Sequence, residues 1–459
     1  MTKTNTFHLV SLGCAKNTVD SDSMAQLLMR DGYQGIDDPE KAEVLIVNTC
    51  GFIGPAKDES FEVLGELAEI KRGGQILIAA GCLTQRYGAE VAQKVPGVDG
   101  VLGTRRWMDI VKVVRELRLS TPARAAEPGR AGSGLRPEPL YHLPDDAATV
   151  GTDEQNALRA SVAGASAYLK VADGCRRPCA FCAIPLIKGT AVSRPVESIL
   201  NEARILRDSG VRELILIAQD TTDYGHDLGM KDGLAILLEQ LTDAVPDMDW
   251  IRIMYSYPGY VTDRMIGVMA EREQILPYLD IPLQHAHPKT LYRMKRPSNI
   301  EWVHKTLGKM RAAMPDLSIR TTFIVGYPGE TDEEYQALVD FVEEIRFDRV
   351  GTFQFSFEEG TTSAPLGDPV PASVKQERFE HLMELQQSIS MQINQSYVGK
   401  TLDVLVEGFD NGISVGRSYR DAPEIDGMVF IEGKLELGQI VPIRITGAMA
   451  YDLTGVPAM

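Results

Sequence analysis

Residues 171–183 read VADGCRRPCAFCA and place Cys175, Cys179 and Cys182 in a C-x3-C-x2-C spacing. Three thiolates this close together can hold three corners of a cubane iron–sulfur cluster and leave the fourth iron without a protein ligand. An open iron can take part in chemistry, whereas a cluster with four cysteine ligands only stores electrons. A structural zinc knuckle and three buried thiols are the alternative interpretations. Zinc sites usually combine C-x2-C pairs with a further Cys or His nearby, and none follows here.

The other three cysteines each end a short apolar run near the N-terminus. The runs are FHLVSLGC (7–14), EVLIVNTC (43–50) and QILIAAGC (75–82), and they end in Cys14, Cys50 and Cys82. Apolar residues at helical spacing lie between or after these runs, at 22–30, 58–71 and 104–117. Alternating strands and helices predict a parallel sheet with helices on its faces.

A parallel sheet would bring these three cysteines together. Ligands of such sheets bind outside the carboxyl ends of the strands, which is where the three cysteines fall. We therefore predict that Cys14, Cys50 and Cys82 form a second three-thiolate iron–sulfur site, again with an open iron. The alternative is three unrelated buried cysteines, because a free cysteine often packs as a small core residue.

The rest of the chain divides by composition and periodicity. Residues 120–160 are rich in proline and glycine and have no sustained apolar period, which predicts a linker or a long surface loop. Six β/α patterns follow and predict a partial TIM-like barrel, with the C-x3-C-x2-C motif in the loop after its first strand. An apolar stripe predicts one long helix at 371–396. The predicted domains are 1–119 (α/β domain with a three-cysteine site), 120–160 (linker), 161–396 (barrel and long helix) and 397–459 (small barrel).

Polar residues end several of the predicted barrel strands. Gln219 ends the second of these strands and Gln284 the fourth, so we predict that both line a cavity for a cofactor or substrate. Ordinary loop polarity is the alternative. His285 and His287 resemble a metal-binding pair only weakly, and we interpret them as ordinary loop residues.

Short strands with turns at 401–409, 412–419, 427–433 and 439–447 predict a small antiparallel C-terminal barrel. Such barrels often bind RNA, but residues 397–459 carry five Lys and Arg against nine Asp and Glu. We therefore expect an acidic module that docks a basic protein, with Asp421, Glu424 and Asp426 in the docking surface. Direct binding of nucleic acid is not expected.

The composition sets further bounds. The 459-residue chain is 44% hydrophobic and 24% charged, which is typical of a globular protein. No run of 18 apolar residues exists, so a transmembrane helix is not expected. We expect the short apolar stretch near residue 10 to be a strand rather than part of a secretory signal. Six cysteines in a chain this long predict a reducing cytoplasm rather than a disulfide scaffold. The net charge of −17 suits a basic partner protein better than nucleic acid. The alternative, which charge alone favours, is that the acidity only aids solubility.

With Phe181 before its last cysteine, the C-x3-C-x2-C motif resembles the signature of radical S-adenosylmethionine (SAM) enzymes. The three predicted folded parts together resemble the methylthiotransferases, which combine a three-cysteine domain, a radical SAM barrel and a TRAM domain. The resemblance implies two four-iron four-sulfur clusters. Cys14, Cys50 and Cys82 would hold the cluster that handles the incoming sulfur. Cys175, Cys179 and Cys182 would hold the cluster that binds SAM and cleaves it to a deoxyadenosyl radical.

The resemblance also implies a further SAM as methyl source, a sulfur donor and a reductant such as flavodoxin or ferredoxin. One branch of the family (MiaB-like) modifies a tRNA adenosine, and another (RimO-like) modifies an aspartate β-carbon of small ribosomal subunit protein number twelve. VSLGCAKNTVDS (10–21) and GRSYRDAPEIDG (416–427) are similar to the RimO-like sequences. We therefore predict a ribosomal-protein methylthiotransferase. A tRNA methylthiotransferase and a non-enzymatic iron–sulfur protein are the alternatives.

Overall fold

The computed structural model of the chain describes residues 5–125, 138–144 and 155–458 and contains two compact units. The first unit comprises Met1–Ser161, Ala172–Arg177 and Cys182–Arg194. The second unit comprises Val162–Val171, Pro178–Phe181 and Pro195–Met459. The chain therefore passes between the units within the loop that carries the C-x3-C-x2-C motif.

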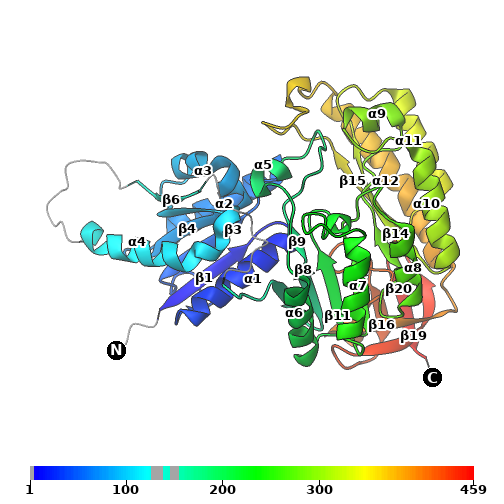
Figure 1. Cartoon of the computed structure of the whole chain (residues 1–459), viewed down its shortest axis with the longest axis horizontal. Coiled ribbons are helices and arrows are strands. Elements are labelled where there is room, and N and C mark those ends of the chain that lie inside the picture. Colours follow the sequence, from blue (N-terminus) through cyan, green and yellow to red (C-terminus); the bar gives the residue numbers. More distant parts are fainter. Residues whose placement is uncertain (1–4, 126–137, 145–154, 459) are drawn as a thin grey trace. The chain divides into compact units, whose positions relative to one another are not determined.

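A parallel sheet forms the centre of the first unit (Figure 1). Its strand order is β2-β1-β3-β4-β5-β6. Its strands are β1 (Thr6–Ser11), β2 (Gln34–Gly35), β3 (Val44–Thr49), β4 (Ile76–Gly81), β5 (Gly100–Gly103) and β6 (Leu140–His142). Every residue of β3 and β4 is buried, because helices cover both faces of the sheet. This burial explains why both strands are nearly continuous apolar runs in the sequence. The predicted parallel α/β arrangement is confirmed for this unit.

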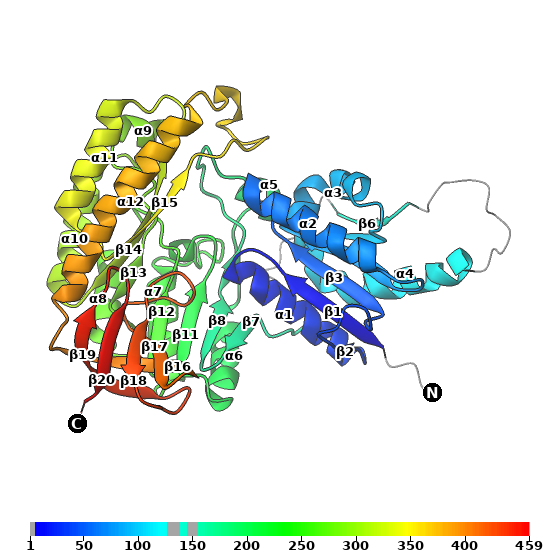
Figure 2. The same cartoon turned by 180° about the vertical axis from the view of Figure 1, so that it is seen from behind.

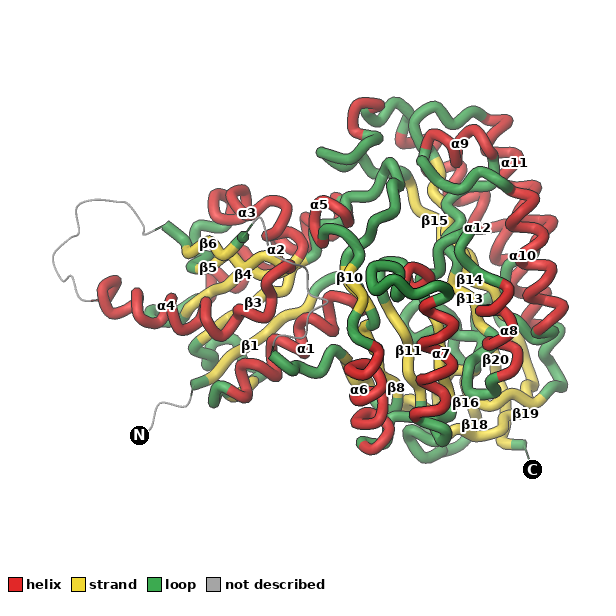
Figure 3. Tube along the Cα trace, viewed as in Figure 1, coloured by secondary structure: helices red, strands yellow, loops and turns green. Residues whose placement is uncertain are grey.

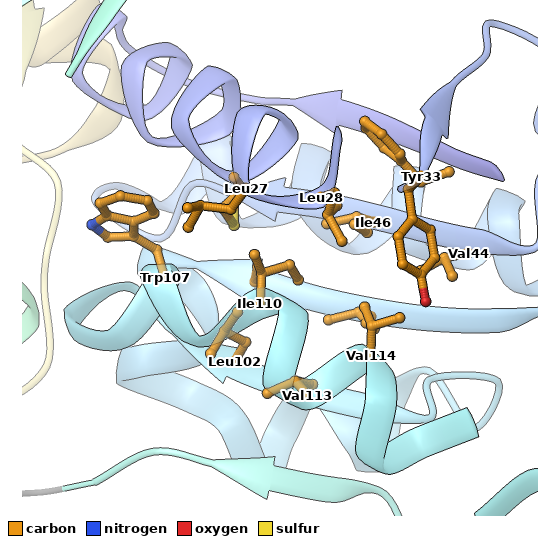
Figure 4. Packing of buried hydrophobic residues seen from close by; sticks show 14 of the residues in the cluster. Leu27, Leu28, Tyr33, Val44, Ile46, Leu102, Trp107, Ile110, Val113 and Val114 are labelled. Carbon is orange, nitrogen blue, oxygen red and sulfur yellow. The ribbon is translucent and has the colours of Figure 1, made fainter. Parts of the chain in front are cut away.

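Helices cover both faces of the sheet. They are α1 (Ala15–Arg30), α2 (Gly54–Ile70), α3 (Cys82–Lys94), the 3-10 helix η1 (Thr104–Asp109) and α4 (Ile110–Ala125). Val44 of β3 packs in one core with Leu28 of α1 and Val114 of α4 (Figure 4). The next residue, Leu45, points to the opposite face and shares a core with Leu64 of α2. The sheet therefore has α1 and α4 on one face and α2 and α3 on the other.

The stretch predicted as a linker, 120–160, contributes to this fold. Helix α4 continues into it as far as Ala125, and β6 adds a sixth strand beside β5. β6 could not be predicted, because a strand of three residues between Pro139 and Pro144 is too short to show a period. Residues 126–137 and 145–154 of the predicted linker lie outside the described residues.

The second unit contains an arc of parallel strands with helices packed on it (Figure 3). The arc has two sheets, in the orders β12-β11-β8-β7 and β13-β14-β15. Its six parallel strands are β8 (Ser166–Lys170), β11 (Glu213–Ile217), β12 (Trp250–Ile253), β13 (Tyr278–Asp280), β14 (Ser318–Val325) and β15 (Arg349–Gln354). The short strand β7 (Ala160–Ala163) lies beside β8 at the edge of the first sheet. The predicted partial barrel with six parallel strands is confirmed.

α-Helices and short 3-10 helices follow the strands of the arc. They are α6 (Val196–Asp208), η2 (Thr221–Asp223), α7 (Gly233–Ala244), α8 (Asp263–Glu271), α9 (Pro288–Arg293), α10 (Ile300–Ala313), α11 (Asp332–Ile345), η3 (Ala364–Leu366) and α12 (Ala372–Gln395). In α11, Tyr335, Leu338 and Val342 are buried at the spacing that places side chains on one face of a helix. The long helix predicted at 371–396 is present as α12.

The C-terminal strands close into a barrel in the order β16-β17-β18-β20-β19 (Figure 2). They are β16 (Thr401–Asp410), β17 (Ile413–Ser418), β18 (Val429–Glu432), β19 (Ile440–Ala448) and β20 (Leu453–Pro457). Val404, Val429 and Ile443 are fully buried in its core. The predicted small barrel is confirmed. Its last strand, β20, was not expected, because LTGVP contains a glycine and a proline and shows no clear alternation.

The predicted fold class, with an α/β domain, a partial barrel and a small C-terminal β-barrel, is confirmed. The small barrel is not wholly antiparallel as predicted, because β18 pairs with β20 in parallel while its other four pairings are antiparallel. The domain boundaries placed from the sequence stay predictions. Within the described residues, no helix is both long enough and apolar enough to span a membrane.

Candidate functional site

Cys14, Cys50 and Cys82 lie at the carboxyl ends of three neighbouring strands of the first unit. Cys14 is the N-cap of α1 after β1, Cys50 follows β3, and Cys82 is the first residue of α3 after β4. β3 pairs in parallel with both β1 and β4, so the three strands end at one edge of the sheet. The fold therefore gathers at one edge three cysteines that are distant in sequence, as predicted.

Buried side-chain amides fix the loop of Cys14 to the end of β3. Asn17 Nδ2 donates to the Leu12 carbonyl at 2.6 Å and to the Asn48 carbonyl at 3.2 Å. Asn48 Nδ2 in turn donates to the Asn17 carbonyl at 2.9 Å and to Ser21 Oγ at 2.8 Å. Asn17 and Ser21 belong to the stretch 10–21, so part of that motif positions the cysteine loop.

Glycines beside the cysteines allow the loops to approach closely. Gly13 has a φ of +91°, and a Cβ at this position would lie 2.8 Å from Cys50 Cβ. Gly81 has a φ of +104°, and a Cβ there would lie 2.4 Å from Asn48 Oδ1. Both positions combine a left-handed backbone with no room for a side chain, so each requires glycine.

The thiols of this site have unusual electrostatics. Burial raises the pKa of Cys82 to about 12, against the opposing effect of Lys188. Burial also raises the pKa of Cys50. The neighbouring thiol of Cys14 raises the pKa of both Cys50 and Cys82 further. Two helices begin at Cys14 and Cys82, and a helix N-terminus favours negative charge. Iron binding by these thiols therefore requires the loss of protons, and the helix termini favour the resulting thiolates.

The loop that carries Cys175 and Cys182 is closed at its base within the first unit. β9 (Ala172–Asp173) pairs antiparallel with β10 (Val192–Ser193), and Cys175 N donates to the Gly189 carbonyl at 3.0 Å. Gly174 has a φ of +77°, and a Cβ there would lie 2.1 Å from the Thr190 carbonyl oxygen. The short helix α5 (Ile184–Lys188) follows Cys182. Local pairing therefore holds both ends of this loop.

Cys179 belongs to the second unit, where a cation and an aromatic ring lie beside its sulfur. Arg296 Nη1 donates to Cys179 Sγ at 3.5 Å, and Tyr257 Oη lies 3.8 Å from the same sulfur. The Arg296 guanidinium stacks 4.2 Å from the centre of the Tyr257 ring. A cation in this position stabilises negative charge on the sulfur. Sequence reasoning missed both residues, because they lie 117 and 78 positions from Cys179 and follow no pattern.

The predicted cavity residues Gln219 and Gln284 both follow strands of the arc. Gln219 is partly buried just after β11, and Gln284 forms an isolated parallel bridge with Phe323 of β14. Gln284 has a φ of +74° and Tyr255, just after β12, has a φ of +63°. Residues other than glycine rarely adopt this conformation, and such strain clusters at functional sites. The role of Gln219 and Gln284 in binding a cofactor or substrate stays a prediction.

The two loop histidines have local partners. His285 Nδ1 accepts a hydrogen bond from His287 N at 2.9 Å, and His287 Nδ1 accepts one from Lys289 N at 3.3 Å and so caps α9. Within the described part of the chain, no three His, Cys, Asp or Glu side chains are gathered as ligands of a single metal ion. None of the six cysteines forms a disulfide. Their role as ligands of iron–sulfur clusters stays a prediction.

Two of the three acidic residues predicted to dock a partner are buried inside the second unit. Asp421 is 2% exposed and accepts a hydrogen bond from Arg349 Nη2 at 2.7 Å. The Asp426 side chain is 1% exposed and accepts one from Tyr278 Oη at 2.7 Å. Glu424 is exposed. The prediction of a docking surface is therefore wrong for Asp421 and Asp426, because their charges are used inside the fold.

The same segment, 416–427, joins the C-terminal barrel to the base of the arc through buried ion pairs. Glu213, at the start of β11, accepts from Arg417 Nη2 at 2.6 Å and from Arg252 Nε at 2.8 Å. Burial opposes ionisation of Glu213, but the two guanidinium groups outweigh it and lower its pKa to about 2. Arg420 forms a further ion pair with Asp348 at 3.1 Å. This motif therefore has a structural role between the two parts of the second unit.

Three family models match the chain. The model described as "Uncharacterized protein family UPF0004" matches residues 6–103, that of the radical SAM superfamily matches 169–342, and that of the TRAM domain matches 398–457. Among solved structures, the chain resembles the radical S-adenosylmethionine methyltransferase TsrM from Kitasatospora setae, with a TM-score of 0.56. The identity is 14% over 88% of this chain and 81% of that chain, so this likeness concerns the fold.

Curated relatives match over nearly the whole chain. The ribosomal protein uS12 methylthiotransferase RimO of Chloroflexus aurantiacus is 48% identical over 98% of this chain and 99% of its own. The corresponding protein of Roseiflexus sp. (strain RS-1) is 47% identical over 98% and 96%. That of Synechocystis sp. is 42% identical over 100% and 99%.

The fold and these matches define a radical SAM enzyme, a class that uses a four-iron four-sulfur cluster and SAM. More particularly, the chain belongs to the RimO family of methylthiotransferases. The prediction of this family, made from the cysteine motifs, the three predicted folded parts and the segments 10–21 and 416–427, is confirmed.

Proposed function

We propose that this enzyme transfers a methylthio group to the β-carbon of an aspartate in ribosomal protein uS12. The observation that carries the proposal is the identity of 42–48%, over 98–100% of the chain, to relatives named for that reaction. The RimO-like sequences at 10–21 and 416–427 support the same branch. No observation on this chain favours a tRNA substrate.

We infer that the enzyme carries two four-iron four-sulfur clusters. Cys14, Cys50 and Cys82 would hold the first. Cys175, Cys179 and Cys182 would hold the second, at which SAM binds. The thiol donors at the edge of the first-unit sheet, the close approach of their loops and the two helix N-termini fit a cluster of net negative charge. When bound, the clusters and SAM supply the radical chemistry and the sulfur.

The protein residues would position these groups. Arg296 and Tyr257 place a cation and a hydroxyl beside Cys179 and would stabilise the charge on its sulfur. Gln219 and Gln284, at the carboxyl ends of arc strands, would orient SAM or the substrate through their amide groups. We place the enzyme in the cytoplasm, with a sulfur donor and a reductant such as flavodoxin or ferredoxin as partners. The net charge of −17 favours the approach of a basic substrate protein.

The proposal is tested by the intact mass of uS12 isolated from cells with and without the gene. We expect a mass gain of one methylthio group on one aspartate, absent without the gene. A gene copy encoding Cys179→Ala should fail to restore the modification, whereas a copy encoding the surface change Lys94→Met should restore it. An unchanged uS12 mass, with loss of a methylthio-adenosine from tRNA, would contradict the proposal and assign the enzyme to the other branch.

A further inference from the structure

Four charged side chains are buried together in the first unit, outside the cysteine sites. Arg159 Nη2 lies 2.7 Å from Asp20 Oδ1 and 3.7 Å from Asp173 Oδ2. Lys188 Nζ lies 2.8 Å from Asp20 Oδ2 and 3.5 Å from Asp173 Oδ1. Each of these side chains is at most 3% exposed. We call these four residues the ionic cluster.

The members of the ionic cluster come from segments next to the cysteines. Asp20 lies on α1, which begins directly after Cys14. Asp173 ends β9, just before Cys175, and Lys188 ends α5, which follows Cys182. The ionic cluster therefore links the helix that starts at one cysteine site to both ends of the loop that carries the other.

A second contact holds α5 to the same unit. The guanidinium group of Arg105, on η1, donates from Nε to the Ile187 carbonyl and from Nη2 to the Leu186 carbonyl, each at 3.0 Å. These carbonyls belong to a short helix that would otherwise expose them. The Arg159 guanidinium stacks 4.2 Å from the centre of the ring of Trp107, which also lies on η1. Helix η1 thus supports α5 directly and the ionic cluster through Arg159.

Lys188 also influences the first cysteine site. Burial opposes the charge of Lys188, but Asp173, Asp20 and Cys82 outweigh it and raise the pKa of Lys188. Lys188 is therefore a cation near Cys82 as well as a partner of both carboxylates. Replacing it would disturb the contact between the two cysteine-bearing parts of this unit.

We propose that the ionic cluster is a positioning device that fixes the segments of Cys175 and Cys182 against the helix of Cys14 and so sets the spacing of the two iron–sulfur sites. This inference rests on the proposed function. Sulfur held at one site must reach a carbon radical generated with SAM at the other, and a displacement of about 1 Å can cost roughly a hundredfold in rate. A buried ion pair contributes little net stability, but moving its partners apart leaves buried charges unpaired and is costly. The ionic cluster can therefore hold its segments at fixed positions.

The test compares the full-length, cluster-loaded wild-type enzyme with Lys188→Met, the conservative Lys188→Arg and the control Lys94→Met, whose side chain is 56% exposed on α3. In Lys188→Met we expect the iron content and SAM cleavage to stay within about twofold of wild type. The methylthio groups transferred per SAM cleaved should fall roughly tenfold to a hundredfold. The magnetic coupling between the two reduced clusters, measured by electron paramagnetic resonance (EPR), should change. Lys188→Arg should restore most of the transfer ratio and of the magnetic coupling, and Lys94→Met should match wild type.

A readout without clusters separates positioning from chemistry. In the cluster-free protein, amide hydrogen exchange of Ile184–Lys188 should be at least roughly tenfold faster in Lys188→Met than in wild type. If Lys188→Met does not fold, Arg105→Gln is the test variant in its place. It removes the two hydrogen bonds to α5 and leaves no unpaired charge buried in the fold. It should change the coupling and the transfer ratio in the same direction, by a smaller factor.

Unchanged coupling and an unchanged transfer ratio in the variant that folds would overturn the positioning role. A wild-type enzyme that holds one cluster, or that cleaves SAM and transfers no methylthio group to uS12, would contradict the proposed function instead. The two failures are therefore distinguishable.

Discussion

Three loops at one sheet edge supply Cys14, Cys50 and Cys82, whereas a single loop supplies Cys175, Cys179 and Cys182. Both sets consist of three thiols, yet they depend on different parts of the fold. The first set needs the register of β1, β3 and β4 and the close approach of Gly13 and Gly81 to neighbouring loops. The second set needs the local closure by β9 and β10 and the contact of Arg296 with Cys179.

This difference shows two ways to build a three-thiolate site. A loop with closely spaced cysteines can be recognised from its sequence alone, and its cysteines stay close together whatever the register of the sheet. A site assembled from three strand ends is recognisable only through the fold, and it fails when the sheet is disturbed. The two sites should therefore respond differently to mutation, and five variants test this.

The largest expected effect is the loss of a single thiol. Cys179→Ala should abolish reductive cleavage of SAM, and with it all methylthio transfer. Cys50→Ala should equally abolish transfer to uS12 but leave SAM cleavage within about an order of magnitude of wild type, because the C-x3-C-x2-C loop is intact. Deoxyadenosine and modified uS12 are measured in the same reaction. Loss of SAM cleavage in Cys50→Ala would show that the two sites are not independent.

Glu213→Gln should give the next largest effect, on the stability of the second unit. It leaves Arg252 and Arg417 buried without their shared carboxylate, which should cost about 3–5 kcal/mol of unfolding free energy. The matched control Glu239→Gln removes a partner of Arg264 at the surface and should change stability by about 0.5 kcal/mol or less. Chemical denaturation measures both. Iron bound through Cys14, Cys50 and Cys82 should be unaffected at low temperature.

The same variant has a defined pH dependence. The pKa of Glu213 in the folded protein, about 2, lies below the ordinary value of 4.5. Ionised Glu213 therefore stabilises the folded protein fully above about pH 4.5, and this contribution is lost as the pH falls toward 2. The difference in stability between wild type and Glu213→Gln should shrink over that range. A constant difference would contradict the assigned ion pairs.

Gly81→Ala should weaken the first site selectively. The added methyl group meets Asn48 Oδ1 in a left-handed backbone conformation, and strain of this kind costs about 1–3 kcal/mol. We expect a lower melting temperature and loss of iron from the first site, with SAM cleavage retained. Gly73→Ala, where a Cβ meets nothing within 4 Å, is the matched control and should resemble wild type. Equal loss of iron from both sites would contradict the claim that the two sites depend on different parts of the fold.

The smallest effect is expected for Arg296→Met, because a single hydrogen bond joins this side chain to a thiol of the second set. Removal of the hydrogen bond to Cys179 Sγ should make the midpoint potential of the SAM-binding cluster more negative and slow SAM cleavage by roughly tenfold or less. The potential of the other cluster should not move. Arg296→Lys should retain part of the effect of the cation, and redox titration followed by EPR measures all three proteins. A shift of both potentials by the same amount would contradict a local role.

Much of the fold could be predicted because its elements have strong periodic signals. The buried run VLIVNT of β3 and the apolar stripe of α11 are typical of their positions in the fold. The short strands β6 and β20 could not be found, because three to five residues with proline or glycine nearby show no period.

The sites divide in the same way. The six cysteines could be found from spacing and from their places after strands. Arg296 could not, because its contact with Cys179 exists only after the chain has folded. We predicted Asp421 and Asp426 to be surface residues. Their partners Arg349 and Arg320 are distant in the sequence, so these ion pairs cannot be seen before the chain folds. The ionic cluster was missed for the same reason, because Asp20, Arg159 and Lys188 are distant in sequence.

The most direct test of two separately built sites is an anaerobic iron count combined with a SAM titration followed by EPR. It compares wild type with one variant that replaces Cys14, Cys50 and Cys82 by alanine and another that replaces Cys175, Cys179 and Cys182. We expect each variant to hold half of the wild-type iron, and SAM to change the spectrum only of proteins that retain the second set. Full iron in either variant, or a response to SAM in the protein that lacks the second set, would contradict the account.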